Sequence, residues 1–309
     1  DDVDISADGN YIVAGGDYRL FLYNVSSNTL LWTYDAQNYI TDLMISGDGN
    51  YIIMEDIDDT IYVFHISSST PLWNKTYSSV FSIDISFDGS LILICGQEIS
   101  LFNSTSSLPL WTYNSTSYSY IGKLSENGKY ACVRTSSSII PMIHIFETNH
   151  SEPLWNYTST KILRSIDFSA SGNYLVAGDI DGNMRLFDRS SSLPLFSYKV
   201  EERVDEICIS NNGDYFAAGL SGKILFFQKG ILTPLWSYST IESLLTMKIS
   251  TNGNYICANL QNSGIILINK NFPYIFGDAS MGTLLVLMTG GLIIFSLVYI
   301  SILKKSYFL

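Results

Sequence analysis

The sequence predicts an all-β fold, a seven-bladed β-propeller of four-stranded antiparallel blades, followed by one C-terminal transmembrane α-helix. Three observations predict it. A Ser-x-x-Gly turn recurs seven times at a spacing of about 40 residues, an aromatic residue follows almost every turn, and a long uncharged segment lies near the C-terminus. A period of about 40 residues with four short strands in each copy is typical of a propeller, whose blades bury their faces only against one another.

The turn glycines and the aromatic residues mark the seven copies. The turn glycines are Gly9, Gly49, Gly89, Gly128, Gly172, Gly213 and Gly253. The aromatic residues that we expect to pack between blades are Trp32, Trp73, Trp111, Trp155, Phe196 and Trp236, with Ile275-Phe276 in this place in the last copy. The blades then cover about residues 1–40, 41–80, 81–120, 121–162, 163–204, 205–244 and 245–278 of one domain, residues 1–278.

Blade five illustrates the strands that we expect in each copy. An inner strand at 165–168 is followed by a turn, a second strand at 174–178, a third at 184–187 and an outer strand at 194–198. Glycine suits the tight turns because it accepts positive φ, and β-branched and aromatic residues suit the packed strands. Blade four carries a Ser-rich insertion, residues 135–141, which we expect to stand out from one face.

Three aspartates share one position of the inner strand: Asp4, Asp84 and Asp167. They could surround an axial channel and form a site for a cation or a polar ligand. We favour the other interpretation, in which they accept hydrogen bonds from loops of neighbouring blades.

Two propeller families resemble these repeats. The segment from Ser165 to Gly182 is similar to a WD repeat, and its Asp-Gly dipeptide recurs at 8–9, 48–49 and 88–89. Residues 63–73 resemble a repeat of the pyrroloquinoline-quinone type, and that resemblance implies a tryptophan late in each blade that packs against the next blade. Strict WD repeats contain Gly-His and Trp-Asp dipeptides and quinoprotein dehydrogenases contain adjacent cysteines, and this sequence has neither. The resemblance therefore implies an architecture and no quinone cofactor.

The sequence contains no recognisable catalytic or cofactor-binding constellation, so we expect a binding scaffold for a protein, peptide or glycan and not an enzyme. The alternatives are a propeller enzyme (a quinoprotein-like oxidoreductase or a hydrolase) and a structural component of a cell envelope. The net charge of −12 opposes binding to nucleic acid, because an acidic surface repels phosphate.

Residues 279–303 contain no charged residue. A helix of this length would span about 37 Å, more than the roughly 30 Å of a bilayer's hydrocarbon core, so we predict a transmembrane helix at 279–303 that contacts lipid through 283–303. Lys304 and Lys305 follow directly. The positive-inside rule then predicts a single-pass protein of the cell membrane, with a cytoplasmic tail at 304–309 and the propeller outside.

Six Asn-x-Ser/Thr sequons are candidate glycosylation sites: Asn24, Asn74, Asn103, Asn114, Asn149 and Asn156. Their number is close to chance, but all six are expected on outer strands or on the turns before them, and all belong to blades one to four. We therefore predict that blades five to seven face a partner or the membrane.

Two hairpins resemble fragments of a calcium-binding loop: residues 179–183, with Asp179 and Asp181 as weak candidates for metal ligands, and residues 55–59 at the same place in blade two. Calcium requires six to eight oxygen ligands, including a late bidentate carboxylate that both segments lack. We therefore favour a solvated turn and expect no metal site. The four cysteines have no paired spacing and are expected to be small buried hydrophobic residues.

Overall fold

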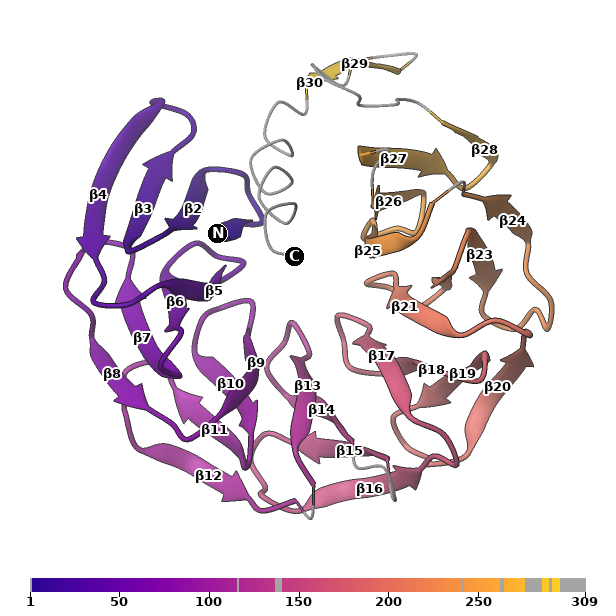
Figure 1. The fold of residues 1–309 in the computed structure, drawn as a ribbon, viewed down its shortest axis with the longest axis horizontal. Helices are drawn as coiled ribbons and strands as arrows, with labels where there is room; N and C mark the ends of the chain where they lie inside the picture. Colours follow the sequence, from indigo (N-terminus) through magenta and orange to yellow (C-terminus); the bar gives the residue numbers. More distant parts are fainter. Residues whose placement is uncertain are drawn as a thin grey trace. The chain divides into compact units, whose positions relative to one another are not determined.

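The computed structural model describes residues 2–115, 117–136, 141–240, 242–261, 264–275, 285–288 and 291–294. The described part of the chain is all-β. It contains seven four-stranded antiparallel sheets, each built from four consecutive strands (Figure 1), and this arrangement fits a seven-bladed β-propeller.

The strands of the first four sheets are as follows. The first sheet contains β1 (Asp2–Ile5), β2 (Tyr11–Gly16), β3 (Arg19–Asn24) and β4 (Thr29–Asp35). The second contains β5 (Ile40–Ile45), β6 (Tyr51–Asp56), β7 (Thr60–His65) and β8 (Trp73–Thr76). The third contains β9 (Val80–Ile85), β10 (Leu91–Gly96), β11 (Ile99–Asn103) and β12 (Pro109–Tyr113). The fourth contains β13 (Ser119–Leu124), β14 (Tyr130–Thr135), β15 (Met142–Glu147) and β16 (Pro153–Thr158).

The last three sheets repeat the same order. The fifth contains β17 (Leu163–Phe168), β18 (Tyr174–Asp179), β19 (Asn183–Asp188) and β20 (Pro194–Lys199). The sixth contains β21 (Val204–Ile209), β22 (Tyr215–Leu220), β23 (Lys223–Gln228) and β24 (Trp236–Ser239). The seventh contains β25 (Leu244–Ile249), β26 (Tyr255–Leu260), β27 (Gly264–Asn269) and β28 (Phe272–Ile275).

The described residues fall into two compact units. The first comprises residues up to 135 together with 144–154, and the second comprises 136–143 and the residues from 155 onward. In the first unit the inner strands β1, β5, β9 and β13 follow one another side by side, and in the second unit β17, β21 and β25 do the same. Each unit is therefore a stack of sheets that pack face to face.

Burial follows the position of a strand in its sheet. In the second sheet the second and third strands, β6 and β7, are buried at almost every residue. Outer strands alternate instead: in β16 the even-numbered residues are exposed and the odd-numbered ones are partly buried. Successive side chains of a strand point to opposite faces, so an outer strand presents one row to the next sheet and one to solvent.

The Ser-x-x-Gly turns are present as predicted, and all seven turn glycines have φ between +65° and +75°. In the second sheet the Ser46 hydroxyl donates to Asp48 (2.6 Å) and accepts from the Tyr51 amide (3.0 Å). Close packing is a second reason for glycine: a Cβ on Gly213 would lie 2.5 Å from the Tyr174 ring of the preceding sheet. An L-residue there would meet both an unfavourable φ and a collision.

The tryptophans connect each sheet to the next. Five indole N–H groups each donate to the carbonyl of the residue that follows the third strand of the next sheet. The bonds run from Trp32 to Ile66 (2.8 Å), Trp73 to Ser104 (2.8 Å), Trp111 to Thr148 (2.7 Å), Trp155 to Arg189 (2.6 Å) and Trp236 to Lys270 (2.8 Å). Four of the rings also lie against a phenylalanine of that third strand, as Trp73 does against Phe102 at 5.7 Å between ring centroids. These tryptophans hold neighbouring sheets together by a hydrogen bond and a ring contact.

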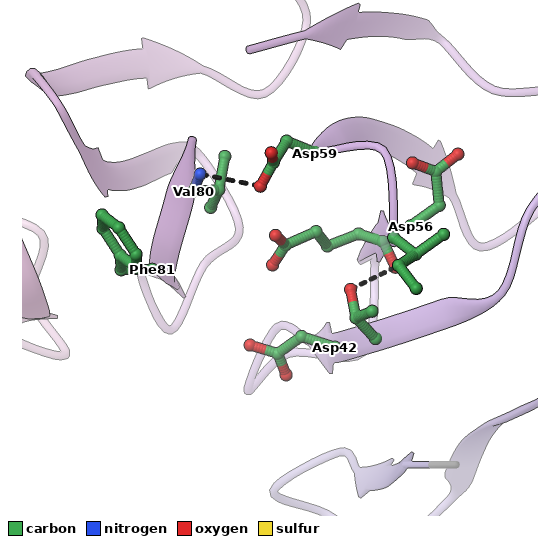
Figure 2. Close-up of a pocket in the computed structure, with 8 residues that line it drawn as sticks. Asp42, Asp56, Asp59, Val80 and Phe81 are labelled. Carbon is green, nitrogen blue, oxygen red and sulfur yellow. Dashed lines mark hydrogen bonds between the residues drawn. The ribbon is translucent and has the colours of Figure 1, made fainter. Parts of the chain in front are cut away.

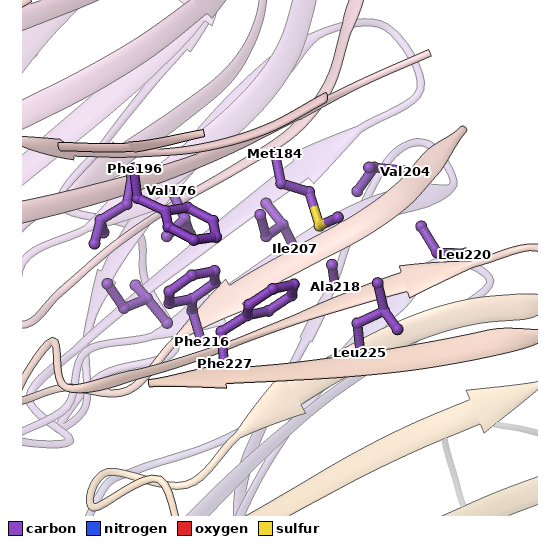
Figure 3. Packing of buried hydrophobic residues seen from close by; sticks show 12 residues of the cluster. Val176, Met184, Phe196, Val204, Ile207, Phe216, Ala218, Leu220, Leu225 and Phe227 are labelled. Atoms are coloured by element: carbon purple, nitrogen blue, oxygen red, sulfur yellow. The ribbon is translucent and has the colours of Figure 1, made fainter. Parts of the chain in front are cut away.

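Phe196 takes the tryptophan position in the fifth sheet and has no N–H to donate. Its ring packs edge-on against Phe216 at 5.5 Å and Phe227 at 5.6 Å (Figure 3). At this position apolar ring contacts take the place of the indole hydrogen bond.

Replacing Trp73 by phenylalanine should lower the free energy of unfolding by about 1–2 kcal/mol, because the Ser104 carbonyl loses its donor and the smaller ring leaves space. Urea denaturation of the purified chain measures this change. The neighbouring Leu72 is exposed, so Leu72→Ala should cost no more than about 0.5 kcal/mol. Equal losses in the two variants would contradict the role assigned to the indole.

The predicted transmembrane helix is not confirmed. Most of 279–303 lies outside the described residues, and its described residues form a two-stranded hairpin of β29 (Leu285–Met288) and β30 (Gly291–Ile294). Among the residues that the structure describes, no helix has the length and apolar character needed to cross a bilayer. The tail at 304–309, Phe276 and residues 137–140 of the blade-four insertion also lie outside the described residues.

Candidate functional site

The three inner-strand aspartates bond to the neighbouring sheet, although to a strand and not to a loop. Asp4 accepts from the Ile45 amide (2.9 Å). Asp84 accepts from the Leu124 amide (2.6 Å), and Asp167 from the Ile209 amide (2.9 Å). We expected loop partners because the repeat pattern does not show that inner strands lie next to one another. These carboxylates connect neighbouring sheets, and they belong to no group of three potential metal ligands among the described residues.

Asp179 is fully buried, whereas Ile180 and Asp181 of the same hairpin are 37% and 38% exposed, so our interpretation of a solvated turn holds only for part of the hairpin. The Asp179 carboxylate accepts from the amides of Asp181 (3.0 Å) and Asn183 (2.9 Å), from the Asn183 side chain and from Arg185 Nη1 (3.0 Å). Asp181 is more exposed and pairs with Lys161 Nζ at 2.8 Å. Protein donors occupy Asp179, and no group of three potential metal-ligating side chains occurs among the described residues.

The predicted placement of the sequons holds only in part: Asn74 and Asn156 lie on outer strands and Asn149 on the turn before one, whereas Asn24 and Asn103 end third strands and Asn114 follows an outer strand. Asn74, Asn114, Asn149 and Asn156 are exposed. Asn24 and Asn103 are partly buried, and their side-chain oxygens accept from the amides of Ser27 (2.9 Å) and Thr105 (3.0 Å). The four cysteines are free, and three of them are buried, as we expected of small hydrophobic residues.

An acidic pocket of about 360 Å³ lies between the second and third sheets, within the first unit (Figure 2). We define the acidic pocket by its lining residues, which are Thr41, Asp42, Glu55, Asp56, Ile57, Asp59, Val80 and Phe81. Asp42 comes from β5, Asp59 from the hairpin after β6, and Val80 and Phe81 from β9. Four of these side chains are acidic and none is basic.

Two of the four acids have a structural role. Asp56 is buried and accepts from the amides of Asp58 (3.1 Å) and Thr60 (3.0 Å), so it holds its hairpin as Asp179 holds the corresponding one. Asp59 accepts from the Val80 amide (2.9 Å) and thereby connects the second sheet to the third. These two carboxylates are explained by the fold.

Glu55 has no such role. Its side chain is 8% exposed, and among the described residues its carboxylate makes no hydrogen bond and no ion pair. Burial raises its pKa to about 7, and the charges of Asp42, Asp59 and Asp56 add to the effect. An acid that is nine-tenths buried without a partner is costly, because its charged form is poorly solvated.

Asp42 faces Glu55 across the strand pair, since the two residues are partners in the register of β5 and β6. Burial raises the pKa of Asp42 to about 7 as well, and the carboxyl group of Asp2 adds to the rise. Lys123 lowers the pKa of Asp42, but it also lies 3.7 Å from Asp84, which shares its charge. The acidic pocket is therefore short of positive charge.

Three other sheets have no room for a side chain at the position of Glu55, whereas the remaining three hold Cys95, Arg134 and Asn259 there. In the first three, the equivalent positions, matched by strand register, hold Gly15, Gly178 and Gly219. A Cβ would lie 2.7 Å from Leu43 at Gly15, 2.4 Å from Val204 at Gly178 and 2.0 Å from Leu244 at Gly219. The second sheet places a glutamate at a position where three others are closed against their neighbours, so its side chain occupies a gap between sheets.

An aromatic patch adjoins the acidic pocket through Phe81, which belongs to both. We define the aromatic patch as Phe81, Tyr118 and Tyr120, whose side chains are 42%, 48% and 36% exposed. The Phe81 ring lies 4.7 Å from that of Tyr120 and 5.6 Å from that of Tyr118. Exposed aromatic clusters are enriched at protein-binding surfaces.

Our reading of the sequence noted Glu55 only as part of the calcium-loop-like segment 55–59, and it did not identify Asp42 or Phe81. A position-by-position comparison of the repeats would have found Glu55, because a charged residue replaces the glycine of three other copies. No comparable signal marks the pocket itself, since Val80 and Phe81 belong to the next repeat and approach Glu55 only in the folded chain.

Comparison with known proteins supports the architecture. A model of the family described as WD domain, G-beta repeat matches residues 151–188, which contain β16 to β19. Together with the seven sheets, this match fits a WD-like β-propeller, a fold that commonly serves as a scaffold for protein interactions. No curated protein matches the chain. The resemblance to pyrroloquinoline-quinone repeats stays a prediction.

Proposed function

We propose that this chain is a non-enzymatic scaffold that binds a protein partner through the acidic pocket and the aromatic patch, and that it works outside the cell on a C-terminal membrane anchor. One observation carries the proposal: Phe81 lines a pocket with four acids and no base and also contacts two other exposed aromatic rings, Tyr118 and Tyr120. Aromatic residues supply contact energy at protein interfaces and charges select the partner.

The anchor and the location rest on sequence. The uncharged residues 279–303, followed by Lys304 and Lys305, support a single span with the propeller outside. Exposure of four of the six sequon asparagines is compatible with glycosylation. Lipid contact through 283–303 belongs to this proposal.

Proximity labelling on intact cells tests the proposal. A labelling enzyme inserted at an exposed outer turn, beside Glu152, should biotinylate a reproducible set of surface proteins when the labelling reagent cannot cross the membrane. The double variant Phe81→Ala/Tyr120→Ser should lose some of these neighbours while its abundance at the surface is unchanged. Labelling that occurs only in permeabilised cells would contradict the extracellular location, and an identical set of neighbours in both proteins would contradict the scaffold surface.

N-glycosidase digestion of the same sample gives an independent measure of location. We expect a shift in mass that disappears when the exposed sequons are changed to glutamine. A glycan-free protein would remove the sequons as support for the extracellular location.

A further inference from the structure

We infer that the acidic pocket binds a single basic side chain, a lysine ammonium or an arginine guanidinium, presented by an extended segment of a protein partner. This inference rests on the proposed function and names the chemistry that the same surface would recognise.

The carboxylate of Glu55 has no partner among the residues that the structure describes. Asp56 and Asp59 already accept hydrogen bonds within the fold, whereas Glu55 is 92% buried, lines the pocket and accepts none among the described residues. A buried carboxylate is stabilised by a charged donor more than by any neutral one. The bound cation would supply this donor.

The side chains that line the acidic pocket around Glu55 carry only negative charge. Asp42 opposes it on β5, Asp56 and Asp59 follow it on β6 and the next hairpin, and Val80 and Phe81 close the other side without charge. A cation that enters reduces the repulsion among all four carboxylates at once. A neutral or anionic group would leave the repulsion unchanged or increase it.

Exposed apolar and aromatic side chains adjoin the acidic pocket. Ile57 is 61% exposed on one side of the acidic pocket, and Phe81 leads to Tyr118 and Tyr120 on the other. A lone metal ion would gain nothing from these apolar groups, whereas the methylene stem of a lysine or arginine and the residues beside it would pack against them. The surroundings therefore favour a side chain of a peptide over an inorganic cation.

Peptide selection tests this inference. The 309-residue chain in detergent is used to select from a displayed library of random 12-residue peptides, and we expect enrichment of lysine or arginine at one fixed position beside apolar residues. In the selected peptide, replacing arginine by citrulline or lysine by norleucine should weaken binding roughly tenfold or more, as should Glu55→Gln with Asp42→Asn in the protein. Fluorescence anisotropy of the labelled peptide measures both changes.

Glu152→Gln is the matched control, because it removes one acidic charge from an exposed turn outside the pocket. It should leave the affinity within about twofold of the original, since screened surface charges contribute little. If basic peptides bound only through a general attraction to an acidic protein, their affinity would fall equally in all variants. That result would overturn the inference. Selected peptides that lack basic residues, or a library from which no peptide is enriched, would overturn the inference too.

The two proposals fail in different ways. If peptides bind and depend on Phe81 and Tyr120 but not on Glu55, the scaffold stands and the pocket inference is wrong. If a basic peptide binds the pocket but labelling on cells finds no neighbour that depends on the aromatic patch, the pocket inference stands and the proposed function is wrong.

Discussion

Replacing Asp179 by alanine should lower the free energy of unfolding by about 3–5 kcal/mol, the largest effect that we expect from a single polar substitution in this protein. Asp179 is fully buried and Arg185 is 11% exposed, and their side chains meet at 3.0 Å. Loss of the carboxylate leaves the guanidinium buried without its anion and the amides of Asp181 and Asn183 without an acceptor. Urea denaturation followed by tryptophan fluorescence measures the change.

Asp181→Ala is the matched control for this prediction. Asp181 lies in the same hairpin, but its ion pair with Lys161 is solvent-accessible, with side chains 38% and 48% exposed. Exposed pairs contribute about 0–1 kcal/mol, so this variant should unfold close to the original protein. The pair of variants separates an anchoring role from a surface one. An Asp179→Ala protein as stable as Asp181→Ala would contradict the anchoring role.

Adding calcium distinguishes the two roles considered for Asp179, a hairpin anchor and a calcium ligand. If Asp179 acts only on the hairpin, millimolar calcium should leave the unfolding midpoint of the original protein unchanged, because a ligand that binds the native state must raise it.

The double variant Asp179→Leu/Arg185→Met should recover part of the stability that Asp179→Ala loses, since it removes both charges of the pair and not only one.

Glu55→Gln should stabilise the protein at pH 8 by on the order of 2 kcal/mol and should have little effect near pH 4.5. Burial and three neighbouring acids raise the pKa of Glu55 from its ordinary value of 4.5 to about 7. Between these two pH values the native protein holds a proton that the unfolded chain has released, so its stability falls as the pH rises through this interval. Above the native pKa the cost is complete and constant. Glutamine has no such cost at any pH.

Denaturation curves from pH 4.5 to pH 8 measure this difference. Asp42→Asn should behave similarly, because burial and its neighbours raise its pKa to about 7 too. The two gains should not add, since the charge of Asp42 contributes to the raised pKa of Glu55. Glu152→Gln, on an exposed turn, should give a difference that does not vary with pH. A Glu55→Gln protein that is less stable than the original at pH 8 would show that the carboxylate has a partner in the native state.

Stability and binding make opposite demands on the acidic pocket. An acid that destabilises the free protein is retained more easily where a partner supplies the missing positive charge, and this exchange of stability for function is common at binding sites. A Glu55→Gln protein that is more stable and binds basic peptides less tightly is the combined result that both arguments predict.

The seven turns and the four-stranded copies could be predicted from sequence because their causes are local. A serine and a glycine three residues apart define each turn, since the Ser46 hydroxyl bonds within its own turn and Gly49 takes positive φ there. Alternation along the outer strands correctly placed Trp73 inward and Asn74 outward, because successive side chains of a strand point to opposite faces. The partners of the inner-strand aspartates were predicted only in part. They lie in the neighbouring copy, as expected, but Asp4 bonds to a strand 41 residues away in the chain and not to a loop.

The sequence by itself determined the repeat, the turns and the residues that face a neighbouring sheet, because each depends on spacing within a single copy. Only the tertiary structure decided which of the charged residues are buried and which of those have a hydrogen-bond or ion-pair partner. Asp179 and Asp56 proved to be buried anchors of their hairpins, whereas Glu55 lines a pocket together with Val80 and has no partner in the part of the chain that the structure describes. The physical reason is that burial and charge neutralisation depend on side chains from adjacent copies, and one repeat read alone contains no information about the distance between them.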